Sequence, residues 1–223
     1  MIYLLVDEQL DEQLIIKGEN FKYLVKVRRH SEGDSLFFRS RKNIEELVKY
    51  KVISIENRAM NLEKISSVYQ RVEARKKLHI AWCVIDPKSV EKVLPSLSEI
   101  GVSQISFISC DRSQKNFKHD LKRFDRILET SMQQSGRTSK IVFDQYKSIK
   151  DFLEKFPDTK VFDFSDKTLD DVSDVQRVLI GCEGGFSENE RTFLKSFDVC
   201  KFDTDLVLRS ESAVLAIASK ILL

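Results

Sequence analysis

The sequence predicts two domains, a small β-barrel followed by an α/β domain with a mostly parallel sheet. Residues 1–70 hold several short strand patterns and only one short helix pattern. From Leu78 onward strand patterns alternate with helix patterns, which is typical of a parallel sheet. The basic stretch Arg71–Lys77 separates the two regions, and a chain of 223 residues has room for one or two domains. We therefore expect a barrel over residues 1–70 and a second domain over residues 71–223.

The first region has apolar, β-branched segments with a period near two. A turn at residues 31–34 contains Gly33 and Asp34 and leads into the second of these segments. Small barrels of this kind often carry RNA. The predicted strands are Ile2–Val6, Ser35–Arg39 and Leu47–Ile55, and the predicted helix is Phe21–Val27.

The second region begins with an apolar strand, and Pro87 then opens a helix that Gly101 ends. The remaining elements follow from apolar runs of strand length and from helix-spaced apolar residues. The predicted strands are Leu78–Ile85, Gln104–Ser109, Val161–Phe164, Val178–Ile180 and Leu206–Leu208. The predicted helices are Pro87–Ile100, Lys118–Ser135, Ser187–Ser196 and Ser212–Leu222.

Composition argues against a membrane protein and against a metalloprotein. No apolar run approaches the roughly 20 residues that cross a bilayer, and Met1–Val6 lacks the basic start of a signal peptide. We therefore expect a cytoplasmic protein. The cysteines and histidines lack metal-ligand spacing, so we expect no metal, reduced structural thiols, and histidines that are at the surface or hydrogen-bonded. These residues are Cys83, Cys110, Cys182, Cys200, His30, His79 and His119.

Positive charge is concentrated in two regions although the net charge is only +2. Residues 1–77 carry 16 Lys and Arg against 12 Asp and Glu, and residues 112–140 carry eight against three. This asymmetry fits a polyanion that contacts the protein at two places. Solvated helix faces would explain the charge equally well.

A glycine-rich loop is the sharpest local feature of the sequence. The strand Val178–Ile180 runs into Gly181, Gly184 and Gly185, and Ser187 and Glu190 have the spacing of a capping box that starts the next helix. Glycines let the backbone approach a ligand, and small molecules bind past the carboxyl ends of strands in open α/β sheets. We expect a small-molecule site here, with a tight structural turn as the alternative.

The charge and the motifs of the loop limit which ligands it can bind. The loop has neither the lysine of a P-loop nor the G-x-G-x-x-G pattern. Glu183 would repel a polyphosphate, whereas a sulfonium or amine fits more easily, which points to S-adenosylmethionine. The rival interpretation is a nucleotide-dependent enzyme that binds phosphate at the start of the following helix.

A second feature places Arg209 at the start of the last helix, where Ser210 or Ser212 can provide the cap. A cation at this position opposes the helix dipole, so it adds nothing to helix stability. We therefore expect Arg209 to have a functional role.

These segments resemble the RsmE-type branch of the SPOUT RNA methyltransferases. Residues 181–187 are similar to that family's GPEGG-F-S motif, and residues 208–213 to its LRTETA motif. Residues 99–102 and 111–113 match ELGV and SERS, residues 134–137 match QSGR, and residues 26–28 match VLR, all in the family's order. The chain departs from the pattern in having Cys182 for proline, Ser210 and Ser212 for threonines, and Phe164-Ser165 for a histidine-proline pair.

The resemblance implies a PUA-like β-barrel, a methyltransferase domain with a deep trefoil knot, and a homodimer with each active site near the subunit interface. It implies that S-adenosylmethionine binds among three loops, with backbone groups of Gly181, Leu206 and Leu208 holding the adenosine end. The implied substrate is 16S rRNA of the small ribosomal subunit, methylated at N3 of one uridine. The cofactor-binding residues are then Phe164, Gly181, Gly184, Gly185, Leu206, Leu208 and Ser210.

Within this reading, Arg209 is the candidate that stabilises negative charge on the uracil. Glu183 is either a proton acceptor or a structural carboxylate that accepts hydrogen bonds from loop amides. The candidate RNA-facing residues are Arg28, Arg29, Arg112 and Arg137, although solvation or a helix C-cap would also explain the first two. Alternatives are a SPOUT methyltransferase of another RNA and a non-catalytic RNA-binding factor of ribosome assembly.

Overall fold

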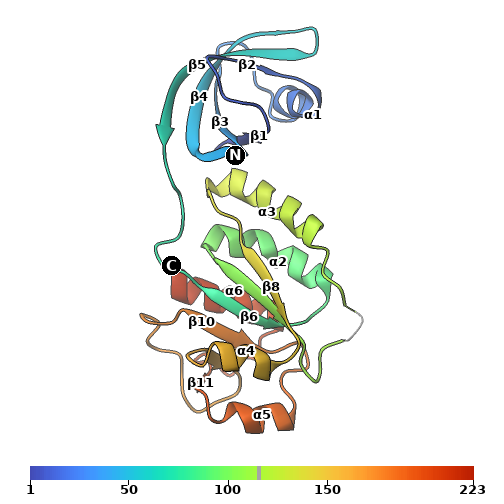
Figure 1. The fold of residues 1–223 in the computed structure, drawn as a ribbon, viewed down its shortest axis with the longest axis vertical. Helices are drawn as coiled ribbons and strands as arrows, with labels where there is room; N and C mark the ends of the chain where they lie inside the picture. The colour runs from blue at the N-terminus through green and yellow to red at the C-terminus, as the bar shows by residue number, and fades with distance from the viewer. Residues whose placement is uncertain (115–116) are drawn as a thin grey trace. The chain divides into compact units, whose positions relative to one another are not determined.

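The computed structural model describes residues 1–114 and 117–223, which form two compact units (Figure 1). The N-terminal unit comprises Met1–Val72 together with Met132–Thr138, and the C-terminal unit comprises Glu73–Ser131 and Ser139–Leu223. Lys115, one of the basic residues counted above, lies outside the described residues. None of the helices in the described ranges combines the length and apolar character that a membrane span requires.

The N-terminal unit is built on a five-stranded sheet with the order β1-β3-β4-β5-β2. Only β1 and β3 pair in parallel; the long hairpin of β4 and β5 turns at Asn57 and Arg58, whose positive φ angles of 52° and 58° suit a tight hairpin. The strands predicted near residues 2, 35 and 47 are confirmed, whereas β2 and β5 were not predicted. The strands are β1 Leu4–Val6, β2 Gln13–Ile16, β3 Ser35–Ser40, β4 Asn43–Glu56 and β5 Ala59–Tyr69.

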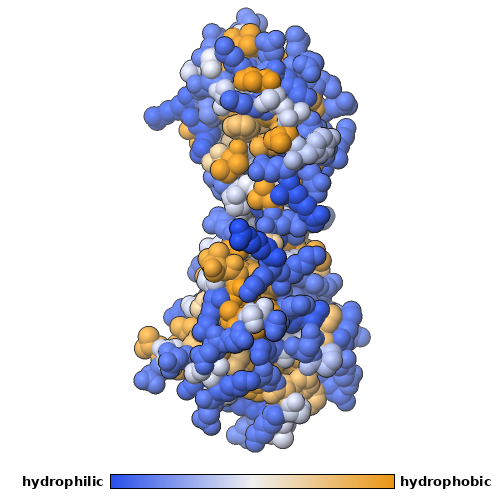
Figure 2. Space-filling view, turned by 90° about the vertical axis from the view of Figure 1, so that its left-hand side faces the viewer, coloured by the Kyte–Doolittle hydropathy of each residue, from blue (hydrophilic) through white to orange (hydrophobic). Residues whose placement is uncertain are grey.

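The predicted short helix is in fact an α-helical turn, α1 (Gly18–Lys22), that continues into a π-helical turn at Tyr23–Val27. Leu24 anchors this segment in the core of the unit at 0% exposure. Several large hydrophobic residues of β4 and β5 remain exposed, and Figure 2 shows hydrophobic groups scattered over a mainly hydrophilic surface. They include Ile53, Ile65, Val68 and Tyr69.

Met132–Thr138 belongs to the N-terminal unit through hydrogen bonds that the sequence boundary did not anticipate. The Tyr3 hydroxyl donates to the Arg137 carbonyl at 2.7 Å, and the Leu5 amide donates to the Gln133 side chain at 2.9 Å. The amide of Val72 donates to the Thr138 hydroxyl at 3.0 Å. A single boundary at residue 70 therefore leaves out the later segment Met132–Thr138, which also belongs to this unit.

The C-terminal unit is an α/β domain whose six-stranded sheet has the order β11-β9-β10-β6-β7-β8, with every pair parallel. This confirms the predicted class. The central strand β6 is buried at all five positions, as expected for a parallel strand covered on both faces. The strands are β6 His79–Cys83, β7 Gln104–Ile108, β8 Val142–Tyr146, β9 Lys160–Phe162, β10 Arg177–Ile180 and β11 Val199–Cys200.

The helices of this unit agree with the prediction at their starts and ends to within a few residues. Gly101 ends α2 with φ of 111°, and its amide donates to the Leu97 carbonyl at 3.2 Å. The elements β8, α4 and β11 were not predicted. The helices are α2 Pro87–Ile100, α3 Leu121–Ser135, α4 Ile149–Lys155, α5 Glu188–Leu194 and α6 Ser210–Leu222; the end of α3 from Met132 onward belongs to the N-terminal unit.

The predicted strand at Leu206–Leu208 is wrong. The segment is an unpaired loop in which Leu206 and Val207 are 76% and 77% exposed. Three apolar residues satisfy a strand pattern in sequence, but among the described residues the segment pairs with no strand, and the sheet ends at β11. The apolar residues therefore serve some purpose other than sheet formation.

Two histidines of the C-terminal unit, the buried His79 and the partly exposed His119, differ in how their ring nitrogens are satisfied. His79 on β6 shares a hydrogen bond of 2.8 Å with the Ser106 hydroxyl, and it contacts Phe152 and Phe156 edge-on. His119 stacks on Phe107 at 3.8 Å between ring centroids, and its Nε2 is buried with no hydrogen-bond partner among the described residues. A hydrogen bond to the backbone of Ile85 also engages the His119 ring, which agrees with the expectation of a surface or hydrogen-bonded histidine.

Acid is expected to destabilise the protein through His79. Burial, reinforced by Arg177, lowers the pKa of His79 from 6.5 to about 4. The unfolded chain therefore binds a proton between these values while the folded chain does not, so stability is full above pH 6.5 and falls toward pH 4, by up to about 3 kcal/mol. Urea unfolding at pH 7 and pH 4.5 measures this, and His79→Asn should flatten the difference. Equal pH dependence in the variant and the parent protein would contradict this account.

Candidate active site

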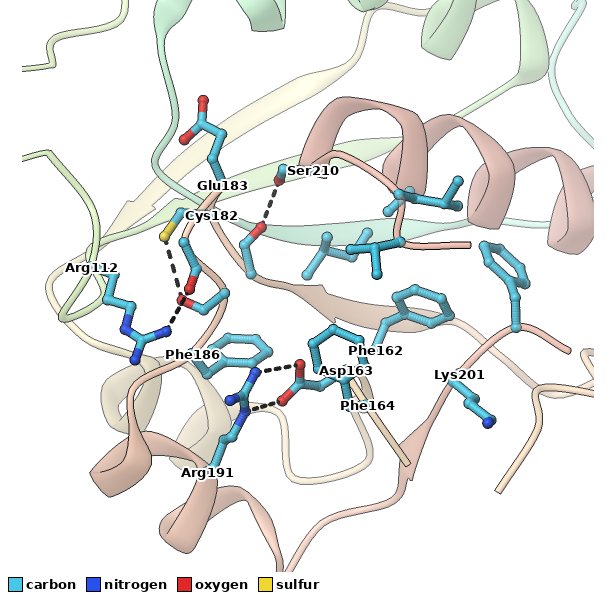
Figure 3. A pocket seen from close by; sticks show the side chains of 18 of the residues that line it. Arg112, Phe162, Asp163, Phe164, Cys182, Glu183, Phe186, Arg191, Lys201 and Ser210 are labelled. Atoms are coloured by element: carbon cyan, nitrogen blue, oxygen red, sulfur yellow. Dashed lines mark hydrogen bonds and ion pairs between the residues drawn. The ribbon is translucent and has the colours of Figure 1, made fainter. Parts of the chain in front are cut away.

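A cavity of about 380 Å³ lies at the carboxyl ends of β9 and β10 (Figure 3). Three loops form most of its wall: residues 162–164 after β9, residues 181–186 after β10, and residues 204–208 before α6. The parallel strands deliver these loops to one edge of the sheet, which is where ligands bind in open α/β folds. Side chains from elsewhere complete the wall, namely those of Arg112, Arg191, Lys201, Phe202 and Ala213.

The glycine loop makes a tight turn whose shape depends on its glycines. The Gly185 amide donates to the Cys182 carbonyl at 2.9 Å, and Gly185 has φ of 66°, which favours glycine. A Cβ atom on Gly181 would lie only 3.3 Å from the Cα of Gly185. The turn therefore brings bare backbone to the cavity.

The predicted capping box at the start of α5 is confirmed. The Ser187 hydroxyl accepts a hydrogen bond from the Glu190 amide at 3.1 Å, and the Ser187 amide donates to the Glu190 carboxylate at 2.8 Å. The Asp111 carboxylate also accepts a hydrogen bond from the Ser187 hydroxyl. Acidic groups thus already occupy the start of this helix, which leaves no place for a phosphate.

A buried hydrogen-bond chain ties the glycine loop to the last helix and to the core. The Trp82 indole N–H donates to the Ser210 hydroxyl at 2.8 Å, and this hydroxyl donates to the Gly181 carbonyl at 2.6 Å. Ser210 is therefore the first residue of α6 and not its cap; Arg209 holds the N-cap position, with no side-chain cap hydrogen bond. The prediction that Ser210 or Ser212 caps the helix is wrong, because the Ser210 hydroxyl is committed to the loop.

The loop after β7 holds the glycine loop from the other side. The Arg112 guanidinium donates to the Gly184 carbonyl at 2.7 Å, and the Asp111 amide donates to the Glu190 carboxylate at 2.8 Å. Figure 3 shows Arg112 reaching across to the loop. Residues 110–113 therefore act as a clamp on the glycine loop.

The polar wall of the cavity is an ion pair between Asp163 and Arg191, joined by two hydrogen bonds of 2.7 and 3.1 Å. The hydrogen bond that Arg191 donates to Asp163 raises the pKa of Arg191, which stays charged. The guanidinium also lies over the ring of Phe164, 5.6 Å from its centroid. Sequence reasoning missed both charged residues, although Asp163 falls inside the strand segment that it singled out.

The structure gathers the predicted cofactor-binding residues into one place. All seven, Phe164, Gly181, Gly184, Gly185, Leu206, Leu208 and Ser210, line the cavity. Glu183 lines it as well, and Figure 3 shows its carboxylate pointing away from the pair of Arg191 and Asp163. Phe162, Lys201, Phe202 and Thr204 also line the cavity and were not predicted.

Arg209 is exposed and lies between two residues that line the cavity, Leu208 and Ser210. Within residues 1–114 and 117–223 its guanidinium has neither an ion-pair partner nor a hydrogen-bond partner. Arg209 is the N-cap residue of α6, next to Ser210, which Figure 3 labels at the start of that helix. The Arg209 guanidinium is thus a positive charge beside the cavity that is available to a ligand.

The predicted RNA-facing arginines fall into three environments. Arg28 and Arg29 are exposed in the N-terminal unit, and Arg29 has φ of 59°. Arg112 is exposed but is engaged with Gly184. Arg137 is only 6% exposed, so its prediction as an RNA-facing side chain does not fit the structure. The basic residues of 112–140 look continuous in the sequence, but Arg137 lies where the backbone packs against Tyr3, whose hydroxyl donates to the Arg137 carbonyl.

Comparison with known proteins agrees with this geometry. The model of a family described as RNA methyltransferase domain matches residues 72–222. The ribosomal RNA small subunit methyltransferase E of Helicobacter pylori strain 26695 is 36% identical over 210 residues, which cover 92% of each chain. A protein of Borreliella burgdorferi named ribosomal RNA small subunit methyltransferase E 2 is 27% identical over 91% of this chain and 88% of its own length.

Solved structures share the fold. A methyltransferase of Legionella pneumophila in complex with S-adenosylmethionine has a TM-score of 0.76 at 20% identity, covering 99% of this chain and 95% of that chain. The ribosomal RNA small subunit methyltransferase E of Neisseria gonorrhoeae, bound to S-adenosylmethionine, has a TM-score of 0.76 at 18% identity, covering 99% and 96%. The family match over residues 72–222 and the 36% identity over nearly the whole chain place this protein in the RNA methyltransferase family, among the ribosomal RNA small subunit methyltransferases E.

Proposed function

We propose that this protein transfers a methyl group from S-adenosylmethionine to N3 of a uridine in 16S rRNA of the small ribosomal subunit. The observation that carries the proposal is the convergence of seven predicted cofactor-binding residues, from three separate loops and the start of α6, on one cavity. The relatives from Helicobacter pylori, which are named as methyltransferases of small-subunit ribosomal RNA, support the choice of substrate.

The residues of the cavity fit this cofactor. A volume of about 380 Å³ lies in the range of small-molecule sites. Leu206, Leu208 and Phe202 offer apolar surface to a nucleoside base, while Gly181 and Gly185 bring backbone groups within reach. The proteins of similar fold from Legionella pneumophila and Neisseria gonorrhoeae hold the same molecule. When bound, the cofactor supplies an electrophilic methyl group on its sulfonium.

Calorimetric titration tests the cofactor assignment against the rival nucleotide site. We expect saturable binding of S-adenosylmethionine and none of ATP, because the start of α5 is occupied by Asp111 and Glu190. Transfer of label from S-adenosylmethionine to ribosomal RNA then tests the reaction. Binding of ATP in place of S-adenosylmethionine would overturn the proposal.

The chemistry requires that uridine N3 lose its proton and that the resulting negative charge be stabilised. The uncommitted guanidinium of Arg209 is suited to the uracil oxygens, where this charge develops. The Glu183 carboxylate accepts no hydrogen bond from the loop amides within the described residues, which favours the proton acceptor over the structural carboxylate. Since N3 lies on the pairing edge, the target base must be unpaired or turned out of its stack.

The proposal extends to the two domains, the oligomeric state and the location of the protein. The N-terminal region, residues 1–70, serves as a PUA-like RNA-binding barrel, and residues 71–223 form a trefoil-knotted SPOUT domain. The protein acts in the cytoplasm as a homodimer. The exposed apolar side chains at the cavity, Phe164, Leu206 and Val207 at 70%, 76% and 77%, support an apolar partner surface there.

Binding of RNA is expected to depend on the exposed arginines of the N-terminal unit. The double substitution Arg28→Gln with Arg29→Asn should weaken binding and reduce the slope of log affinity against log salt by up to about 2, since each lost phosphate contact removes about 0.7–0.9. Asparagine suits the positive φ of residue 29. Lys150→Ala, an exposed cation of α4, is the matched control. A slope equal to that of the parent protein would remove these two residues from the RNA-binding surface.

A further inference from the structure

Three cysteines that are far apart in the sequence meet beside the cavity. Cys83 ends β6, Cys110 follows the end of β7, and Cys182 follows the end of β10. Because the sheet has the order β10-β6-β7, the carboxyl ends of these strands are neighbours. The sulfur atoms of Cys110 and Cys182 lie 3.6 Å apart, and all three thiols are free.

The three thiols differ in access and in acidity. Cys110 is partly exposed, whereas Cys182 and Cys83 are 5% and 0% exposed. The neighbouring Cys182 and Cys83 side chains lower the pKa of the Cys110 thiol, and the Ser113 hydroxyl lies 3.0 Å from its sulfur. The same contact with Cys110 raises the pKa of Cys182, and burial raises that of Cys83. The accessible sulfur is therefore the one stabilised as a thiolate, which is the reactive form.

We propose that Cys110 and Cys182 form a peroxide-sensitive dithiol that closes to a disulfide and weakens cofactor binding; the second part rests on the proposed function. The Cys110 thiolate attacks one oxygen of a peroxide, the O–O bond breaks, and a sulfenic acid and one water or alcohol form after protonation. The Cys182 sulfur then attacks the sulfenic sulfur, the S–O bond breaks, and a second water leaves with the thiol proton. Two thiols have lost two electrons to the peroxide, which is reduced.

The geometry explains why formation of the disulfide would weaken cofactor binding. Bringing the sulfur atoms from 3.6 Å to the roughly 2.05 Å of a disulfide requires a side-chain rotation, and the effect on the cofactor comes from rotation of Cys182 toward Cys110. That rotation removes its hydrogen bond to the Gly185 carbonyl, 3.5 Å away, within the turn that shapes the cavity (Figure 3). It also ties the glycine loop covalently to the clamp of residues 110–113, which already holds Gly184 through Arg112.

Two observations favour a dithiol over other uses of the cluster. Among the residues that the structure describes, no three His, Cys, Asp or Glu side chains are arranged to hold a metal ion. Cys182 also stands where the related motif has proline, which has no thiol, so the pair belongs to this chain's own sequence. Strained or exposed disulfides are typically the labile, reversible ones.

Thiol mapping on the full-length protein tests the chemistry without any activity assay. The reduced protein is treated with hydrogen peroxide, alkylated, digested and analysed by mass spectrometry. We expect a peptide pair linked through Cys110 and Cys182, and its loss on treatment with dithiothreitol. Cys110→Ser should abolish the link, whereas Cys200→Ser, which removes a buried thiol elsewhere in the sheet, should leave it intact. Sulfinic acid at Cys110 with no linked peptide would overturn the proposal.

Calorimetry with S-adenosylmethionine tests the consequence for binding. We expect the oxidised protein to bind about tenfold or more weakly, with recovery on reduction, and Cys110→Ser to keep its affinity after peroxide. Because the coupling is reciprocal, saturating cofactor should slow formation of the disulfide by a comparable factor. A linked protein that binds as tightly as the reduced one would refute the effect on binding. Failure of the reduced protein to bind would instead refute the proposed function, while the mapping would still decide the thiol chemistry.

Discussion

Replacing Arg209 with alanine is expected to lower the turnover of methyl transfer by about 10²–10³-fold while the affinity for S-adenosylmethionine stays unchanged. Arg209 is the N-cap residue of α6, where its positive charge opposes the helix dipole. Its guanidinium is exposed and has no partner among the described residues, so alanine removes no native contact of the side chain. The loss should therefore fall on the step in which charge develops on the uracil.

Single-turnover kinetics and calorimetry separate these effects. Arg209→Lys is the matched control, because it keeps the charge and loses the planar fork, and it should recover only part of the rate. The melting temperature of Arg209→Ala should equal or exceed that of the parent protein. A variant with full turnover, or one whose only defect is cofactor affinity, would show that Arg209 does not act on the substrate.

Replacing Ser210 with alanine is expected to weaken cofactor binding by about tenfold and to reduce stability by about 1–3 kcal/mol. The Ser210 hydroxyl accepts from the Trp82 indole at 2.8 Å and donates to the Gly181 carbonyl at 2.6 Å. Alanine leaves the indole N–H buried without a partner, since Trp82 is 0% exposed. It also releases the carbonyl that fixes the first residue of the glycine loop.

Urea unfolding and calorimetry measure the two consequences of Ser210→Ala independently. Ser210→Thr is the matched control, because threonine keeps the hydroxyl and occurs at this position in the related motif. It should retain both stability and affinity within a factor of a few. If Ser210→Ala binds S-adenosylmethionine as tightly as the parent protein, the hydrogen-bond chain has no part in shaping the site.

The sequence predicted those elements whose signals are local. Pro87 and Gly101 delimit α2 at both ends, and the spacing of Ser187 and Glu190 fixes the start of α5 through hydrogen bonds that form within one turn. The capping box and the glycine turn depend on a few adjacent residues, so they can be read without knowledge of the rest of the fold.

The failures come from contacts made over long distances in the sequence. Leu206–Leu208 has a strand pattern, but among the described residues it pairs with no strand, and the lack of a pairing partner cannot be seen locally. Ser210 was predicted to cap the helix because its position suggested a cap. Its hydrogen bonds to Trp82 and Gly181 could not be foreseen, since they span 128 and 29 residues. Arg137 was counted with a basic surface although tertiary packing buries it.

The thiol cluster shows what strand order adds to a sequence. Cys83, Cys110 and Cys182 have no metal-ligand spacing, and they were predicted to be separate structural thiols. Cys110 and Cys182 each follow a predicted strand, however, and Cys83 lies near the end of another; parallel strands place their carboxyl ends at one edge. The missing information was that β6 lies between β7 and β10. The ion pair of Asp163 and Arg191 was hidden for the same reason, since it joins segments 28 residues apart.

The most direct test of the proposed function is methyl transfer from labelled S-adenosylmethionine to purified small ribosomal subunits that lack the modification. The product nucleoside is identified by mass spectrometry after digestion of the RNA. We predict 3-methyluridine in 16S rRNA, formed by the parent protein and not by Arg209→Ala. Label in a different nucleoside or a different RNA, or no transfer by a protein that binds the cofactor, would contradict the proposal.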